Sequence, residues 1–173
     1  MIDLKKYVKV VLYSYPMLKT IGEEYQIHIS NKALLSYRSQ KSAEELVEYL
    51  AKEIICKNRL EYLKKLLDGI MDKLDETEKA LLDFRYFSTC KNRKKALNEK
   101  SGEMEKISAW SESTYFRRQT KLANKIEALL EGAGFSEEIF ERDFAFIDVF
   151  QCVEKFLQRS GATIYKKERV VRE

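Results

Sequence analysis

Apolar residues recur every three or four positions over most of this chain, which is the spacing of amphipathic helices. Residues 3–26 follow this period and are predicted to be helical. Pro16 lies inside the stretch and removes one helix hydrogen bond, so we expect a kink there or two short helices. Between 27 and 40 the period is lost and Ser and Asn gather. This stretch is predicted to be a loop or a short strand-like crossing.

A long helix is predicted to begin after Ser42, because Ser42 and Glu45 have the spacing of a capping box. Its apolar stripe approaches a heptad pattern with one slip after Ile54. The members of the stripe are Val47, Leu50, Ile54, Leu60, Leu63, Leu67, Ile70 and Leu74. Such a stripe fits packing within the monomer, which we favour, or the seam of a homodimer.

Three more helix starts follow along the chain. Asp75 and Glu78 form a second capping-box pattern, and Ser111 and Ser136 are N-cap candidates. Gly132 and Gly134 can end the helix that Ser111 begins. The helix after Ser136 is predicted to run to Gly161 with apolar residues on more than one face, and the charged tail beyond it is expected to fray.

The composition also favours a mostly helical protein, because the 173 residues include only one Pro and six Gly. The predicted fold class is all-α, a helical bundle with an embedded helix-turn-helix. We expect a helical N-terminal region over 1–74, a DNA-binding domain over 75–131, and a C-terminal helix with a charged tail over 132–173.

Helix 111–131 has the most informative side chains. Tyr115, Leu122, Ile126 and Leu129 define an apolar face, and basic residues occupy the other side. Its first two turns offer side chains that read base edges and hold phosphates, namely Ser113, Thr114, Arg117, Arg118 and Gln119. This pattern is typical of a recognition helix. An ordinary surface helix with a solvated basic face is the alternative.

The distribution of charge favours a nucleic-acid partner for one region only. The net charge is +4, but residues 85–125 hold eleven Lys or Arg against four Glu, so the rest of the chain carries about −3. Basic residues before the helix add to the expected contact surface; they are Lys91, Arg93, Lys94 and Lys95, with Lys121 on the helix itself.

The motif LDETEKALLDFRYF, residues 74–87, is followed downstream by WSESTYFRRQ, residues 110–119. Together they resemble the helix-turn-helix of region four of sigma factors. The resemblance is strongest to sigma-like regulators of phages and mobile elements in Gram-positive bacteria, of the ArpU and RinA type. It covers about a third of the chain. It implies that a recognition helix begins near Ser111 and contacts double-stranded DNA.

The chain departs from the family pattern between the two motifs. Twenty-three residues separate Phe87 from Ser111, more than the family has there. Either part of this connection can therefore form the first helix of the motif. Ala109 and Trp110 stand where the family has a Gly and an aliphatic residue. We expect Leu74, Leu81 and Trp110 to be buried together beneath the recognition helix.

Catalytic and metal-binding signals are missing from the sequence. There is no GxGxxG, GxxxxGK or HExxH motif, the only histidine is His28, and the three cysteines lie far apart. We therefore expect no enzyme activity, no cofactor and no metal. We also expect reduced thiols, a cytoplasmic location, and no signal peptide or membrane span.

Three functions remain in competition on the sequence alone. The first is a sequence-specific transcriptional regulator that binds double-stranded DNA. The second is a helical interaction module that contacts RNA polymerase or another regulator without binding DNA. The third is a packaging subunit of the small-terminase kind, since such proteins also carry helix-turn-helix modules.

Overall fold

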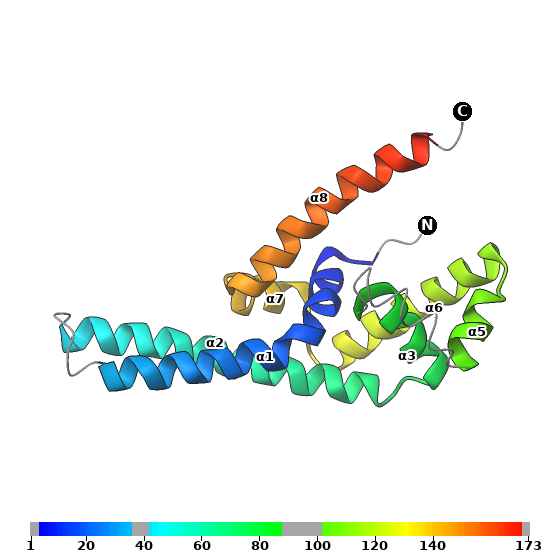
Figure 1. The fold of residues 1–173 in the computed structure, drawn as a ribbon. Helices are drawn as coiled ribbons and strands as arrows, with labels where there is room; N and C mark the ends of the chain where they lie inside the picture. Colours follow the sequence, from blue (N-terminus) through cyan, green and yellow to red (C-terminus); the bar gives the residue numbers. More distant parts are fainter. Residues whose placement is uncertain (1–3, 36–41, 88–101, 171–173) are drawn as a thin grey trace. The chain divides into compact units, whose positions relative to one another are not determined.

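The computed structural model describes residues 4–35, 42–87 and 102–170, and over these it is all helical (Figure 1). The described residues form seven α-helices and one π-helix, with no strand, which confirms the all-α prediction. In chain order the elements are α1 Lys6–Leu35, α2 Ala43–Met71, α3 Glu76–Leu82, η2 Asp83–Phe87, α5 Gly102–Ser108, α6 Glu112–Gly132, α7 Glu137–Asp143 and α8 Asp148–Val170.

The chain divides into two compact units, and each is described separately. One unit is Tyr15–Leu74, and the other joins Met1–Ser14 to Asp75–Glu173. We call them the hairpin unit and the α6 unit. The division into three regions that the sequence predicts, 1–74, 75–131 and 132–173, stays a prediction.

The hairpin unit pairs the later part of α1 with α2 in antiparallel fashion (Figure 1). At one end the Tyr15 hydroxyl donates to Asp68 Oδ1 at 2.6 Å. Toward the other end His28 Nδ1 lies 3.1 Å from Glu53 Oε2. Since residue numbers rise in α1 as they fall in α2, the two helices run in opposite directions.

Asp68 anchors the first of these contacts. Lys64 Nζ bonds it at 2.5 Å and also lies 5.0 Å from the centre of the Tyr15 ring. Burial acts to raise the pKa of Asp68, but the hydrogen bonds from Lys64 and Tyr15 outweigh it and leave that pKa below its usual value. Burial and the Asp68 carboxylate together raise the pKa of the Tyr15 phenol.

The loop predicted over 27–40 is wrong for residues 27–35, because α1 continues to Leu35. Polar residues of this stretch bond α2 instead of forming a turn: His28 contacts Glu53, and Lys32 lies 5.6 Å from the Tyr49 ring centre. Residues 36–40 lie outside the described part of the chain. The helix also continues through Pro16, so the alternative of two short helices is wrong.

The predicted stripe of α2 is buried only in its second half. Leu60, Leu63 and Leu67 are fully buried, whereas Val47 and Ile54 are exposed. The slip after Ile54 explains this result, because six residues from Ile54 to Leu60 rotate the helix by about 240°. The two halves of the stripe therefore lie on different sides of α2. The helix cap is confirmed, since Ser42 Oγ accepts from Glu45 N at 3.2 Å.

Aromatic rings fill the core of the α6 unit. Tyr7 of α1 lies 6.3 Å from Phe135 and 6.2 Å from Phe140, measured between ring centres. Phe144 packs edge-on against Phe135 at 5.3 Å, and Phe150 against Phe140 at 5.5 Å. All five rings are buried. They tie the first turns of α1 to α7 and α8.

The predicted single helix from Ser136 to Gly161 is wrong in two respects. The Ser136 cap is present, but α7 ends at Asp143 and α8 begins at Asp148. The turn between them lets Phe144 and Ile147 both be buried. At the other end α8 passes Gly161 and continues to Val170, because one glycine costs only about 1 kcal/mol in a helix. The tail predicted to fray is therefore helical in part.

Gly134 ends α6 in a Schellman motif. Its φ of 78° is the only positive φ among the described residues. Phe135 N donates to Leu130 O and Gly134 N donates to Glu131 O, both at 2.9 Å. Leu130 and Phe135 are both fully buried, so the apolar contact that accompanies this motif is present. Of the two glycines predicted to end the helix, Gly134 has the left-handed conformation.

This difference predicts opposite effects for the two glycines. Gly134→Ala should lower the free energy of unfolding by about 1–2 kcal/mol, because a Cβ is disfavoured at positive φ. Gly132→Ala should raise it by up to about 1 kcal/mol, because Gly132 is helical and its added Cβ meets nothing within 4 Å. Urea titrations followed by circular dichroism measure both, and equal effects would contradict the assignment.

Candidate nucleic-acid interface

A short connection joins α5 to α6, so α5 is the helix that precedes the predicted recognition helix. Ala109 N donates to Glu105 O at 3.1 Å and Trp110 N to Ile107 O at 3.2 Å, which closes α5. Ser111 then caps α6, since its Oγ accepts from Thr114 N at 3.3 Å. Residues 102–108 therefore form the helix before the turn. This connection has the length found in helix-turn-helix motifs.

Polar contacts from the start of α3 hold both of these helices. The Asp75 capping box is complete, with Glu78 N donating to Asp75 Oδ1 at 2.8 Å and Asp75 N to Glu78 Oε2 at 3.0 Å. Glu78 Oε2 also accepts from Lys125 of α6 at 2.5 Å. Thr77 Oγ1 donates to Glu103 of α5 at 2.7 Å. The first turn of α3 thus bonds α5 on one side and α6 on the other.

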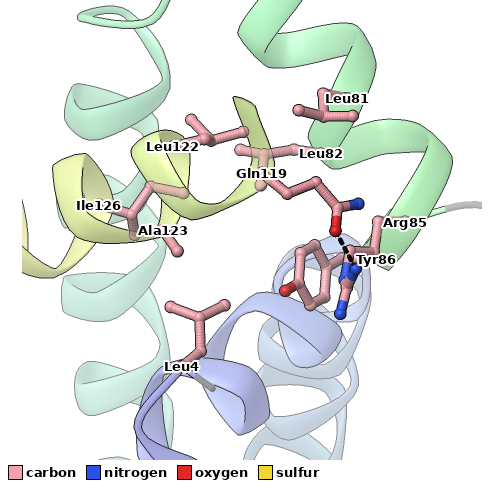
Figure 2. Close-up of a pocket in the computed structure, with 9 residues that line it drawn as sticks. All are labelled: Leu4, Leu81, Leu82, Arg85, Tyr86, Gln119, Leu122, Ala123 and Ile126. Atoms are coloured by element: carbon pink, nitrogen blue, oxygen red, sulfur yellow. Dashed lines mark hydrogen bonds between the residues drawn. The ribbon is translucent and has the colours of Figure 1, made fainter. Parts of the chain in front are cut away.

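Figure 2 shows the inner face of α6, which borders a small hollow. The hollow has about 240 Å³ of empty space, open solvent included. Its lining is mostly apolar and comprises Leu4, Leu81, Leu82, Arg85, Tyr86, Gln119, Leu122, Ala123 and Ile126. Two polar side chains at its rim, Arg85 and Gln119, bond each other. The hollow is therefore best described as part of the packing between α3, η2 and α6.

Gln119 was predicted to contact DNA, but its side chain belongs to this inner face. Its Nε2 donates to the Tyr115 hydroxyl at 2.6 Å, and its Oε1 accepts from Arg85 of η2. The amide is half-buried and both of its ends are engaged within the protein. Both polar ends of Gln119 thus bond within the protein, and its contact with DNA stays a prediction. The residue it pairs with, Arg85, lies in the RYF part of the motif.

The outer face of α6 carries Ser113, Arg117 and Lys121, which we call the outer face residues. They are spaced four apart, so they lie along one side of the helix. All three are exposed, whereas Leu122 and Ile126 on the opposite side are buried. Among the described residues, Arg117 and Lys121 have no carboxylate within 4 Å, unlike Lys125. Their charge is thus available to an outside partner.

The first turn of α6 has its own hydroxyl cluster. Ser111 Oγ lies 2.9 Å from Thr114 Oγ1 and 3.2 Å from Ser113 Oγ. Ser113 is exposed and Thr114 is half-buried. These hydroxyls form a local polar group at the N-terminus of α6, where Ser111 also caps the Thr114 amide.

Arg118 has different surroundings from its neighbour Arg117. Its guanidinium lies over the Trp110 ring, 4.4 Å from the ring centre. Adjacent helical residues point about 100° apart, so Arg118 projects toward the turn and Arg117 away from the protein. Stacking covers the flat face of a guanidinium and leaves its N–H edges able to donate.

The same contact corrects the expectation for Trp110. Leu74 and Leu81 are each buried, but Trp110 is only half-buried. Its ring packs against the guanidinium of Arg118 and so is covered by a cation rather than by the core. The indole thus helps to position a basic side chain of the candidate interface.

Four of the predicted contact residues cannot be placed. Lys91, Arg93, Lys94 and Lys95 lie outside the described residues. One exposed aromatic residue was not among the predicted site residues. Phe116 is 43% exposed and packs edge-on against Tyr115, with ring centres 5.7 Å apart. The sequence signal was its place next to Tyr115 of the predicted apolar face, since adjacent helical residues point about 100° apart.

The described residues contain no group of three or more His, Cys, Asp or Glu side chains that could hold a metal ion. Neither Cys56 nor Cys152 forms a disulfide bond. No helix in the described ranges has the length and apolar character needed to cross a bilayer. Comparison with protein-family models, with curated proteins and with solved structures finds no match to this chain.

The Trp110 contact predicts a spectroscopic difference between the two arginines. Arg118→Ala should shift the emission of the single tryptophan to longer wavelength and raise its quenching by acrylamide, because the ring loses its cover. The change should also lower the free energy of unfolding by about 0.5–1 kcal/mol. Arg117→Ala is the matched control and should leave emission unchanged. Identical spectra for both variants would contradict the stacked geometry.

Proposed function

We propose that this chain binds double-stranded DNA in a sequence-specific manner and regulates transcription, with α6 as the recognition helix of a sigma-like helix-turn-helix. The observation that carries the proposal is the pair of exposed cations, Arg117 and Lys121, that have no carboxylate partner among the described residues and lie opposite the buried face of α6. The resemblance of residues 74–87 and 110–119 to region four of sigma factors supports the same assignment.

The chemistry of the outer face suits the major groove. Arg117 lies on the side of α6 opposite the buried Leu122 and Ile126, so in this proposal it reaches the floor of the groove and reads a guanine edge in bidentate fashion. Lys121, one turn further on, holds a phosphate as a point charge. Ser113 and Thr114 hold the backbone near the helix N-terminus.

Arg118 takes a different role in this proposal. Its guanidinium lies over the Trp110 ring, 4.4 Å from the ring centre, and a guanidinium in this position can still donate from its N–H edges. We assign it a phosphate at the wall of the groove. In this proposal Arg117 reads the base sequence, and Arg118 fixes the orientation of the protein on the duplex.

The proposal is tested by fluorescence anisotropy titrations on a DNA site selected from random duplexes, with a scrambled duplex alongside. Arg117→Ala should lose about fivefold to a hundredfold of the discrimination between the two duplexes. Arg118→Ala and Lys121→Ala should each weaken binding to both duplexes by the same factor. They should also reduce the slope of the logarithm of the binding constant against the logarithm of salt concentration by about one. Lys155→Ala, at an exposed lysine of α8, is the control and should change neither.

Two results would overturn the DNA proposal. One is the absence of salt-dependent binding to any duplex by the folded protein. The other is binding that Arg117→Ala and Lys121→Ala both leave intact.

A second candidate function is a protein-interaction module that contacts RNA polymerase or another regulator. Exposed Phe116 favours it, because an aromatic side chain beside a cationic face is typical of protein interfaces. Binding to purified RNA polymerase, weakened by Phe116→Ala and indifferent to DNA, would support this function.

A further inference from the structure

The outer side of α2 carries a stripe of exposed side chains that the DNA proposal does not use. Val47 is 66% exposed, Ile54 44%, Ile55 46% and Tyr62 51%. Ala51 and Asn58, which lie between them, are exposed as well. We call these six residues the α2 stripe.

Helix geometry makes the α2 stripe continuous. At about 100° per residue, its six members fall within an arc of roughly 100°. The buried residues Cys56, Leu60, Leu63 and Leu67 lie on the opposite side of the helix. From Val47 to Tyr62 the stripe is about 22 Å long at 1.5 Å per residue. The α2 stripe does not include Glu53 and Asp68, the residues through which α2 bonds α1.

The charges along α2 are divided between its two halves. Residues 43–55 contain four Glu and one Lys, whereas residues 56–71 contain four basic and two acidic residues. Two of these charges, Glu44 and Lys65, lie on the same side as the stripe, one beyond each end, and both are exposed. The stripe thus has an acidic end and a basic end.

We propose that the α2 stripe is a self-association surface, which binds the α2 stripe of a second copy of this chain in antiparallel orientation. A two-fold axis between Ile54 and Ile55 sets Val47 opposite Tyr62 of the second copy. The same axis sets Glu44 opposite Lys65, so the acidic end of each helix meets the basic end of the other. A parallel pair would place like charges together, which is destabilising.

Self-complementarity is the reason to commit to a second copy. A two-fold interface requires one surface that matches itself when rotated, and a stripe with opposite charges at its two ends meets this condition. One helical stripe buries less than a standard interface of about 1,600 Å², so the dimer is reversible. The surface lies in the hairpin unit, and the inference does not depend on DNA binding.

The first experiment is sedimentation equilibrium of the full chain, without DNA and with reductant because Cys152 is exposed. The mass should rise with concentration from 20.4 kDa toward twice that value. Ile54→Glu with Ile55→Glu places charges at the two-fold axis and should weaken the dimer at least tenfold. Ile27→Glu, at an equally apolar exposed position of α1, should leave it unchanged. Circular dichroism checks that each variant keeps the helical content of the parent.

Two results of this experiment would overturn the proposal. A mass that stays at one chain up to about millimolar concentration rules out self-association. A doubly charged variant that is folded and dimerises like the parent assigns the interface to another surface. If the α2 stripe binds only a different protein, the mass also stays at one chain, and the proposal is overturned.

Exchanged charges test the antiparallel arrangement. Glu44→Lys alone and Lys65→Glu alone should each weaken the dimer about threefold to tenfold, because like charges then face each other twice. An equal mixture of the two variants should restore parental affinity, since the introduced lysine of one chain would meet the introduced glutamate of the other. A mixture no tighter than either variant alone would overturn the antiparallel assignment.

Discussion

One face of α6 is buried in the interior through Leu122, Ile126 and Leu130, and this burial decides which residues of the helix face outward. Because a helix is rigid around its axis, burying one side fixes the direction of every other side chain. Lys125 to Glu78, and Gln119 to Arg85, bond the same helix to α3 and η2. Lys5, the residue before α1, bonds Glu131 at 2.7 Å near the other end. The orientation of α6 is thus held by apolar packing along its length and by polar contacts at its sides.

This orientation separates two adjacent arginines that the sequence treats as equivalent. Arg117 is exposed and directed away from the core, while Arg118 lies on the ring of Trp110. Gln119, the next residue, is engaged on the inner face. Three consecutive polar residues therefore have three different environments, set by about 100° of rotation each. The proposed division between reading a base and holding a phosphate depends on that separation.

Local signals were predictable from sequence and relations between distant segments were not. The caps at Ser42, Asp75, Ser111 and Ser136 were all predicted, because each depends on residues within three positions. The extension of α1 to Leu35 was missed, since it is supported by contacts with α2. Of the candidate site, the outward direction of Arg117 and Lys121 follows from helical spacing. The stacking of Arg118 on Trp110 and the inward bonds of Gln119 could not be predicted, because they depend on the turn after α5 and on η2.

The most direct test of the central claim is a map of where duplex DNA touches the folded chain. Backbone amide shifts in ¹H–¹⁵N spectra, recorded while a selected duplex is added, provide that map residue by residue. The account predicts the largest shifts between Ser113 and Lys121, with small changes along α8 as an internal control. Shifts that avoid this part of α6, or no shifts at all from a folded protein, would contradict it.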